Sequence, residues 1–320
     1  MSPFLWRRAY YSAPGRQQRL RQPVISVGNI SMGGRGKTPI VAEVARRLVA
    51  AGERPAILSR GYGRRVTADG VVVVSDGARV LADLDRAGDE PLLLAHSVPG
   101  AIVVVNDSRQ LAGALAERSL GATVHLLDDG FQHLQLARDL DLVSIAPEDL
   151  RDRPAPFGRL REPVAALADA DALVIDGEPP AAGGPAATPM FTLRRTLGTP
   201  VPIEADRFGP IAAGTAVSSV AGIARPERFR DALVAAGWTV AAQTTFGDHH
   251  RYRAADVDRI GSAARAAGAG VVLTTEKDAM RLRPFRPLPI AIYSVPLVVD
   301  LLPAAEFDRW LSAGLEASRS

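Results

Sequence analysis

The sequence contains no cysteine. Disulfides, thiolate metal sites and thiol nucleophiles are therefore excluded, and this absence fits a reducing compartment such as the cytoplasm. No stretch approaches the roughly 20 apolar residues that are needed to cross a bilayer. The N-terminus also lacks the apolar core and small-residue cleavage site of a secretory signal. We therefore expect neither a membrane span nor export.

Lysine is nearly absent too, because Lys37 and Lys277 are the only two and arginine supplies the remaining positive charge. The formal net charge is only +3, although the pI is near 9.6. A net charge this small gives no reason to expect nucleic acid as a partner. With 47% hydrophobic and 23% charged residues, the 320-residue chain is typical of a globular protein with one large domain or two ordinary ones.

Residues 1–22 combine aromatic side chains with arginines. Aromatic rings are stable at headgroup depth, and each arginine near anionic lipid contributes about 1 kcal/mol, so the segment is predicted to be amphipathic and membrane-associating. The same composition also fits a helix that packs on the protein by its aromatic face, with its arginines in solvent. The sequence leaves both interpretations open.

Short β-branched runs alternate with helix-like segments from residue 24 onward, which is typical of a parallel sheet with crossover helices. A stretch rich in Pro, Gly and Ala at 177–189 interrupts this alternation, and 190–203 resembles a hairpin or a pair of strands. The predicted fold class is α/β, of the P-loop NTPase type, with a mostly parallel sheet flanked by helices. The predicted organisation is a nucleotide-binding and catalytic domain over 23–177, a linker with a hairpin over 178–205, and a smaller α/β domain over 206–320 that closes over the site.

The strongest local signal is VISVGNISMGGRGKT at Val24–Thr38, a hydrophobic strand followed by a glycine-rich turn and a predicted helix over 39–51. In such a loop, backbone amides surround phosphate oxygens, a lysine reaches the β- and γ-phosphates, and a threonine hydroxyl holds Mg²⁺. The P-loop pattern has glycine where this chain has Ser31. The predicted nucleotide-binding residues are Gly33, Gly34, Arg35, Gly36, Lys37 and Thr38.

Acidic residues at three further places suggest ligands or catalysts. Asp128 and Asp129 directly follow the apolar run 124–127, at the strand end where a Walker B carboxylate holds Mg²⁺, although Asp-Gly is also a common turn. Asp89 in GDEP could equally cap a helix, and Glu162 in LREP could form only a surface ion pair. The adjacent His249 and His250 of FGDHH do not have zinc-site spacing, so a proton-handling or substrate-binding role is more plausible for them.

Ten segments in this order resemble the lipid A 4'-kinase (tetraacyldisaccharide 4'-kinase) family of P-loop kinases. The matching segments are PVISVGNISMGGRGKTP, SRGYGR, GDEP, NDSR, LLDDGFQH, ARDLDLV, GRLREP, AGIARPERF, FGDHH and TEKDAMRL, between Pro23 and Leu282. Members of this family also carry a non-glycine residue at the position of Ser31. The resemblance implies phosphorylation, with ATP and Mg²⁺, of the 4'-hydroxyl of an acylated glucosamine disaccharide 1-phosphate to give lipid IVA.

The resemblance also implies residue roles. Asp89 is the candidate general base and His249 its partner, while the metal or nucleotide roles fall to Thr38, Asp128, Asp129 and Glu162. The candidate substrate contacts are Tyr62, Arg109, Gln132 and Arg161. It further implies a peripheral position on the cytoplasmic face of the bacterial inner membrane, and no obligate protein partner is evident. Relatives commonly begin with a longer apolar helix than this chain has, so weaker membrane affinity is expected.

Two other functions are compatible with parts of the sequence. A P-loop switch ATPase or GTPase would use hydrolysis to change a partner interface, and TEKD at 275–278 superficially resembles a guanine-reading motif, with Glu276 where Asn or Thr is required. A lipid-binding scaffold with a vestigial nucleotide fold would not need Lys37, Asp129 and His249 to be intact.

Overall fold

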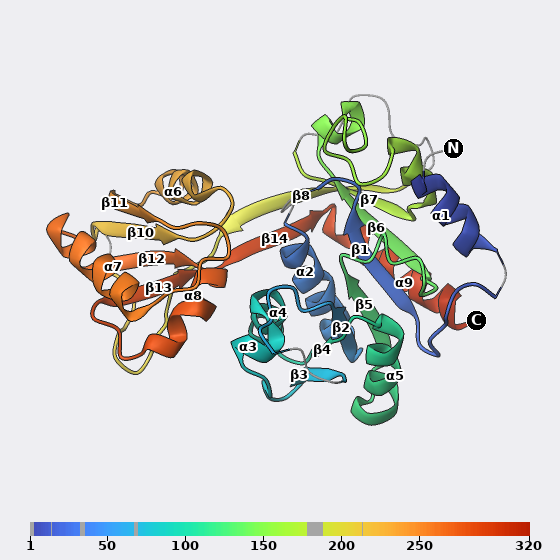
Figure 1. The fold of residues 1–320 in the computed structure, drawn as a ribbon, viewed down its shortest axis with the longest axis horizontal. Helices are drawn as coiled ribbons and strands as arrows, with labels where there is room; N and C mark the ends of the chain where they lie inside the picture. Colours follow the sequence, from blue (N-terminus) through green and yellow to red (C-terminus); the bar gives the residue numbers. More distant parts are fainter. Residues whose placement is uncertain (1–2, 14, 33–35, 67–69, 178–187, 213) are drawn as a thin grey trace. The chain divides into compact units, whose positions relative to one another are not determined.

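The computed structural model describes residues 3–13, 15–32, 36–66, 70–177, 188–212 and 214–320. The chain forms two compact units, one of Met1–Arg194 with Val299–Ser320 and the other of Arg195–Val298. It passes from the first unit to the second in β8 (Met190–Leu197) and returns in β14 (Leu297–Leu302), as Figure 1 shows. Among the described helices, none combines the length and apolar character needed to cross a membrane.

The first unit is built on a sheet of order β14-β8-β7-β6-β1-β5-β2-β4-β3. The pairings from β8 through β4 are parallel, and β3 pairs with β4 in the antiparallel sense at one edge. The strand bounds are β1 Val24–Asn29, β2 Pro55–Ser59, β3 Val72–Asp76, β4 Ile102–Val105, β5 Val124–Asp128, β6 Leu140–Ile145 and β7 Ala172–Ile175. The short β-branched runs at 24–27, 56–58, 101–105, 124–127, 142–145 and 172–175 form β1, β2, β4, β5, β6 and β7, as their sequences predict. The strand β3 was not predicted, because no crossover helix separates it from β2.

The α-helices of this unit lie between its strands in sequence, except for the first, which precedes β1, and the last, which follows β14. The helix bounds are α1 Pro3–Ser12, α2 Lys37–Ala50, α3 Leu84–Ala87, α4 Asp89–Ser97, α5 Arg109–Leu120 and α9 Ala304–Arg319. α2 packs on β1, β2 and β5 through a buried face that includes Ile40, Val44 and Leu48. The strands β1, β5 and β6 are buried along their whole length, which explains their nearly uninterrupted apolar sequences.

The second unit has a smaller sheet of order β11-β10-β12-β13-β9, parallel except for β9 at one edge. Its strands are β9 Val201–Pro202, β10 Val217–Ala221, β11 Val240–Thr245, β12 Val271–Thr275 and β13 Ala291–Val295. Its helices are α6 Pro226–Ala235, α7 Ala254–Ala266 and α8 Glu276–Leu282. The predicted fold class, a mostly parallel α/β sheet with a second smaller α/β domain, is confirmed.

Two details of the predicted organisation differ from the structure. The segment 190–203 forms two strands but not a hairpin, because β8 joins the larger sheet and β9 joins the smaller one. The smaller unit ends at Val298 rather than at the C-terminus. The last helix, α9, packs on the first unit, where Phe307 meets Phe191 edge to face at 4.9 Å between ring centroids.

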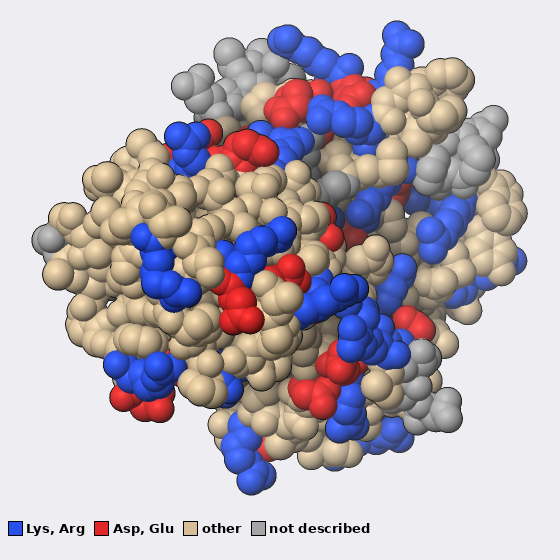
Figure 2. Space-filling model, turned by 60° about the vertical axis from the view of Figure 1, so that its left-hand side comes forward, with Lys and Arg blue, Asp and Glu red and all other residues tan. Residues whose placement is uncertain are grey.

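Ion pairs between distant segments hold α9 in place. Arg47 of α2 pairs with Asp308 at 2.6 Å, and Arg319 pairs with Glu53 at 2.8 Å. Figure 2 shows arginines and acidic side chains interspersed over the face that it draws. Arg47 and Arg319 of the first unit thus lie beside acidic groups.

Candidate active site

The phosphate loop joins β1 to α2. Gly36 is the N-cap of α2 and has φ 68° and ψ 35°, a left-handed conformation that glycine adopts at little cost. Lys37 and Thr38 are the first two helical residues, so their side chains start where the helix dipole and free amides favour anions. Gly33, Gly34 and Arg35, also predicted to bind nucleotide, lie outside the described residues.

A close approach of backbones brings the Asp128-Asp129 turn beside this loop. A Cβ atom on Gly28 would lie 2.4 Å from Cβ of Phe131, so only glycine fits at this position of β1. β1 and β5 pair in parallel, with Val27 opposite Asp128. The two aspartates therefore lie at the same sheet edge as the start of the phosphate loop, where open α/β sheets bind ligands.

Lys37 and Asp129 form the centre of a polar network at this edge. The Lys37 ammonium lies 3.0 Å from Asn29 Oδ1 and 3.0 Å from Asp129 Oδ1. Arg161 Nη1 donates to Asp129 Oδ2 at 2.9 Å and lies 3.4 Å from Gln132 Oε1. Gln132 in turn donates to the Asn29 carbonyl at 2.8 Å. Four of the predicted residues, Lys37, Asp129, Gln132 and Arg161, are thus brought together, and Asn29 is an additional member that the sequence analysis did not identify.

The two adjacent aspartates have opposite electrostatic environments. Burial, with the nearby carboxylates of Glu90 and Asp129, raises the pKa of Asp128 to about 6. Burial would also raise the pKa of Asp129, but Lys37 and Arg161 outweigh it and the pKa of Asp129 is lowered. Asp128 accepts a hydrogen bond from the Ser59 hydroxyl at 3.3 Å. The position of Asp128 is therefore electronegative and favours an added cation.

The donor set suits Mg²⁺ only in part. The hydroxyl of Thr38 and the carboxylates of Asp128 and Asp129 are hard oxygen ligands of the kind that Mg²⁺ prefers. Within the described part of the chain, no group of three or more His, Cys, Asp or Glu side chains is arranged to hold a metal. Two carboxylates, a hydroxyl, phosphate oxygens and water would still complete such a site, as is usual for nucleotide-bound magnesium.

Glu162, which the resemblance predicts as a metal ligand, forms an ion pair with Arg8 of α1. Both side chains are buried, and Arg8 also donates to Asp169 at 2.8 Å and lies 4.2 Å from the Phe131 ring centroid. An arginine therefore fixes helix α1 to the first unit, whereas the packed arrangement considered from the sequence has the arginines in solvent. The aromatic residues Trp6 and Tyr10 stack on each other and are 60% and 39% exposed.

Ser31, the non-glycine residue of the loop, is buried. Its hydroxyl donates to Asp149 Oδ2 at 3.3 Å, and its backbone bridges to Leu160 in the LREP loop. The Met32 amide donates to the Arg159 carbonyl at 2.7 Å. The Ser31 side chain therefore connects the phosphate loop to Asp149, while the backbone of Ser31 and Met32 connects the loop to the segment that carries Arg161.

Asp89 is the first residue of α4 and is buried, whereas the N-cap position belongs to Gly88. Gly88 has φ 84°, and a Cβ there would lie 2.7 Å from the Tyr62 carbonyl oxygen. The SRGYGR turn therefore packs against the start of α4, and the Tyr62 side chain remains 71% exposed. A helix-capping role does not account for Asp89.

A second cluster of basic side chains includes Arg109 at the start of α5, its neighbour Arg60 and His133. Arg109 is buried and donates to the Asn106 carbonyl at 3.0 Å, and its Nε has no hydrogen-bond partner among the described residues. Burial and the neighbouring Arg60 lower the pKa of Arg109 to about 10. Burial, with Arg109 and Arg60, lowers the pKa of His133 to about 4, so this imidazole is neutral at pH 7. Crowded cations with an unused donor are expected where an anion binds.

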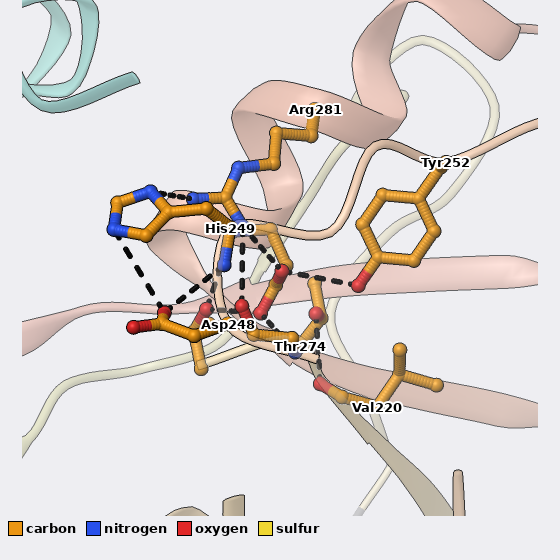
Figure 3. A network of polar contacts seen from close by, with 9 residues as sticks. Val220, Asp248, His249, Tyr252, Thr274 and Arg281 are labelled. Carbon is orange, nitrogen blue, oxygen red and sulfur yellow. Dashed lines mark hydrogen bonds and ion pairs between the residues drawn. The ribbon is translucent and has the colours of Figure 1, made fainter. Parts of the chain in front are cut away.

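His249 lies in the second unit, in the loop after β11. Its φ is 55°, and its amide donates to the Asp248 carboxylate at 3.0 Å. Its Nδ1 lies 3.2 Å from Nη2 of Arg281, as Figure 3 shows. His250 instead pairs with Asp256 at 3.0 Å and stacks on Phe246. The two adjacent histidines therefore have separate partners.

The chain is similar to known kinases along most of its length. A family model described as tetraacyldisaccharide-1-P 4'-kinase (LpxK) matches residues 4–316. The chain is 40% identical over 308 residues to a tetraacyldisaccharide 4'-kinase of Geobacter metallireducens, covering 92% of this chain and 88% of the relative. It is 39% identical over 280 residues to that of Pelobacter propionicus, covering 83% and 76%. A crystal structure of LpxK from Aquifex aeolicus in complex with ATP matches with a TM-score of 0.81 at 30% identity, covering 98% of this chain and 95% of that one. The chain therefore belongs to the tetraacyldisaccharide-1-P 4'-kinase family.

Proposed function

We propose that this protein is a tetraacyldisaccharide 4'-kinase, which transfers the γ-phosphoryl group of ATP to the 4'-hydroxyl of tetraacyldisaccharide 1-phosphate. The observation that carries the proposal is the network of Lys37, Asp129 and Arg161 at the mouth of the phosphate loop. The family model for that reaction matches residues 4–316, and the match to the relative from Geobacter metallireducens covers 88% of that protein. ATP is the nucleotide in the related solved structure.

The first-unit residues would act mainly by positioning and by charge. Lys37 is held by Asn29 and Asp129 close to where β- and γ-phosphate oxygens bind in a P-loop. The Thr38 hydroxyl and the Asp128 and Asp129 carboxylates would hold Mg²⁺, which bridges phosphate oxygens and neutralises their developing charge. Such a cation would also favour the ionised form of Asp128, which burial and the carboxylates of Glu90 and Asp129 disfavour.

Asp89 is proposed as the base that receives the proton of the attacking hydroxyl. It is a buried carboxylate at the start of a helix, and no capping role explains it. Arg109, whose buried Nε has no partner among the described residues, would bind a phosphate or sugar oxygen of the acceptor. Tyr62, Gln132 and Arg161 complete the proposed acceptor contacts. His249 is the proposed partner contributed by the second unit.

We also propose that the enzyme works peripherally at the cytoplasmic face of the inner membrane. A tetraacylated acceptor keeps its acyl chains in a bilayer, so the protein must meet it there. The exposed rings of Trp6 and Tyr10 on α1 would lie at headgroup depth. Because Arg8 is buried in the first unit, the helix presents these rings without leaving the protein.

The test uses the purified chain with ATP, Mg²⁺ and tetraacyldisaccharide 1-phosphate in detergent micelles. The expected result is ADP and a bisphosphorylated disaccharide in equal amounts. ADP formed at the same rate without the acceptor would instead support a switch ATPase.

A further inference from the structure

Asn29, the last residue of β1, holds the Lys37 ammonium from the interior of the first unit. Its Oδ1 accepts a hydrogen bond from Lys37 Nζ at 3.0 Å, and an ammonium has only donors, so the amide must present its oxygen to Lys37. The Asn29 backbone is fixed as well, since it pairs with Ser144 of β6 and its carbonyl accepts from Gln132 Nε2 at 2.8 Å. The side chain is fully buried, so its oxygen has a fixed position beside Lys37.

A chain of buried hydrogen bonds orients this amide. Asn29 Nδ2 donates to the Ser31 hydroxyl at 3.3 Å, and that hydroxyl donates to Asp149 Oδ2 at 3.3 Å. The Asp149 carboxylate also accepts from the Ala146 amide at 3.0 Å. The side chains of Asn29, Ser31 and Asp149 are all fully buried. The donor end of the Asn29 amide thus faces Ser31 and its acceptor end faces Lys37, so a flipped amide would lose both contacts.

Asp129, the other neighbour of the Lys37 ammonium, differs from Asn29 in exposure and in charge. Asp129 Oδ1 lies 3.0 Å from Lys37 Nζ, but it has no hydrogen-bond partner among the described residues, so this contact is an ion pair without hydrogen-bond geometry. The Asp129 side chain is 38% exposed. It also pairs with Arg161 and is a proposed Mg²⁺ ligand. Its carboxylate is therefore divided among several cations, and a further cation weakens its hold on Lys37.

We propose that Asn29 is a positioning residue that keeps Lys37 at the nucleotide phosphates while Asp129 is engaged by Mg²⁺. A neutral carbonyl oxygen accepts a hydrogen bond without cancelling the ammonium charge, so the full charge of Lys37 acts on the β- and γ-phosphate oxygens. A carboxylate in the place of the amide would neutralise that charge. The inference rests on the proposed function and deepens it, because it assigns the positioning of Lys37 to a residue outside the set expected from the sequence.

The Lys37 ammonium can be observed directly, because the chain contains only two lysines. In full-length protein labelled with ¹⁵Nζ-lysine, ¹H–¹⁵N correlation NMR detects the ammonium groups, and Lys277→Arg identifies the signal of Lys37. With Mg²⁺ and a non-hydrolysable ATP analogue, the wild-type Lys37 signal should be sharp, and Asn29→Ala should broaden it beyond detection. The matched control Ser144→Ala removes a buried hydroxyl from the residue that pairs with Asn29, and it should keep the signal. A sharp signal in Asn29→Ala, or an equal loss in Ser144→Ala, would overturn the inference.

Kinetics tests whether Asn29 acts through Lys37. Asn29→Ala should lower kcat about 10- to 100-fold, which is the scale of one hydrogen bond to a charged group. In a Lys37→Ala background, the same change should have little further effect, because residues that act as a unit are not additive. Losses that multiply in the double variant would contradict the positioning role.

Asn29→Asp is a second variant of nearly the same size, and it replaces Asn29→Ala if that variant does not fold. Its carboxylate can still hold Lys37, so the ammonium signal should persist, but kcat should fall because the Lys37 charge is then cancelled. Full kinase activity in Asn29→Asp would show that a neutral partner is not needed. If wild type has no kinase activity at all, the proposed function fails, and the Lys37 signal still decides whether Asn29 positions the ammonium.

Discussion

Replacing Asp128 with asparagine is expected to stabilise the ligand-free protein while it abolishes kinase activity. The wild-type carboxyl titrates at about 6 instead of 3.8 because burial, Glu90 and Asp129 all disfavour its ionised form. Folding therefore loses stability as the pH rises through about 6, and the full contribution is present only below 3.8. Asparagine never ionises, so it avoids this loss, and it can still accept a hydrogen bond from Ser59.

The size of the expected stabilisation follows from the difference between the folded and unfolded pKa of Asp128. Two pKa units at about 1.4 kcal/mol each give up to about 3 kcal/mol at pH 8. In a domain of this size, that corresponds to a rise in Tm of up to about 10 °C. The gain should shrink as the pH falls below 6 and vanish near pH 4, where the wild-type carboxyl is protonated.

The adjacent variant Asp129→Asn is the matched control. Lys37 and Arg161 lower the pKa of Asp129 despite its burial, so its ionised form stabilises the fold and its removal should lower Tm at neutral pH. The assay is thermal unfolding of both variants between pH 4 and pH 8 without nucleotide, followed by melts with ATP and Mg²⁺. A lower Tm for Asp128→Asn at pH 8, or a gain that does not depend on pH, would refute this account of the site.

Three other variants test separate parts of the site. Lys37→Ala should lower kcat by about 10²-fold or more, which is the scale for one lost electrostatic contact in a transition state. Its far-ultraviolet circular dichroism spectrum should be unchanged, and near-normal turnover would count against the assignment of the phosphate loop. Asp89→Asn should lower kcat about 10²-fold with little change in the KM for ATP. Its free energy of unfolding should fall by about 1 kcal/mol, because a negative charge at the start of α4 is lost. Full activity would show that Asp89 is not the base. Trp6→Ala with Tyr10→Ala should weaken binding to anionic liposomes more than turnover in micelles, compared with Val234→Ala on α6, which is also exposed. Equal liposome binding would exclude α1 as a membrane contact.

The local features of the site could be predicted from the sequence. The strand β1, the loop and α2 are consecutive, and the Asp128-Asp129 pair follows an apolar run, so each signal lies within a few residues. The pairing of Arg8 with Glu162 could not be predicted, because 154 residues separate the two and Glu162 was expected to be a metal ligand or part of a surface ion pair. The same holds for β8 and β9, which are adjacent in sequence but belong to different sheets.

The TEKD segment shows another feature that the sequence could not predict. TEKD has a weak likeness to a guanine motif, and only the tertiary contacts of Asp278 with Gly222 and Tyr252 reveal its actual structural role. The FGDHH motif singles out His249, but the contact of its Nδ1 with Arg281, 32 residues away in sequence, depends on the fold.

The proposed reaction is defined by the position on the acceptor that receives the phosphate. The product of the purified chain with ATP, Mg²⁺ and tetraacyldisaccharide 1-phosphate should be isolated and studied by ¹H–³¹P correlation NMR. We expect a new phosphate that couples to the proton on the 4' carbon, formed by wild type and absent with Lys37→Ala. A phosphate at any other position, or inorganic phosphate as the only product, would contradict it.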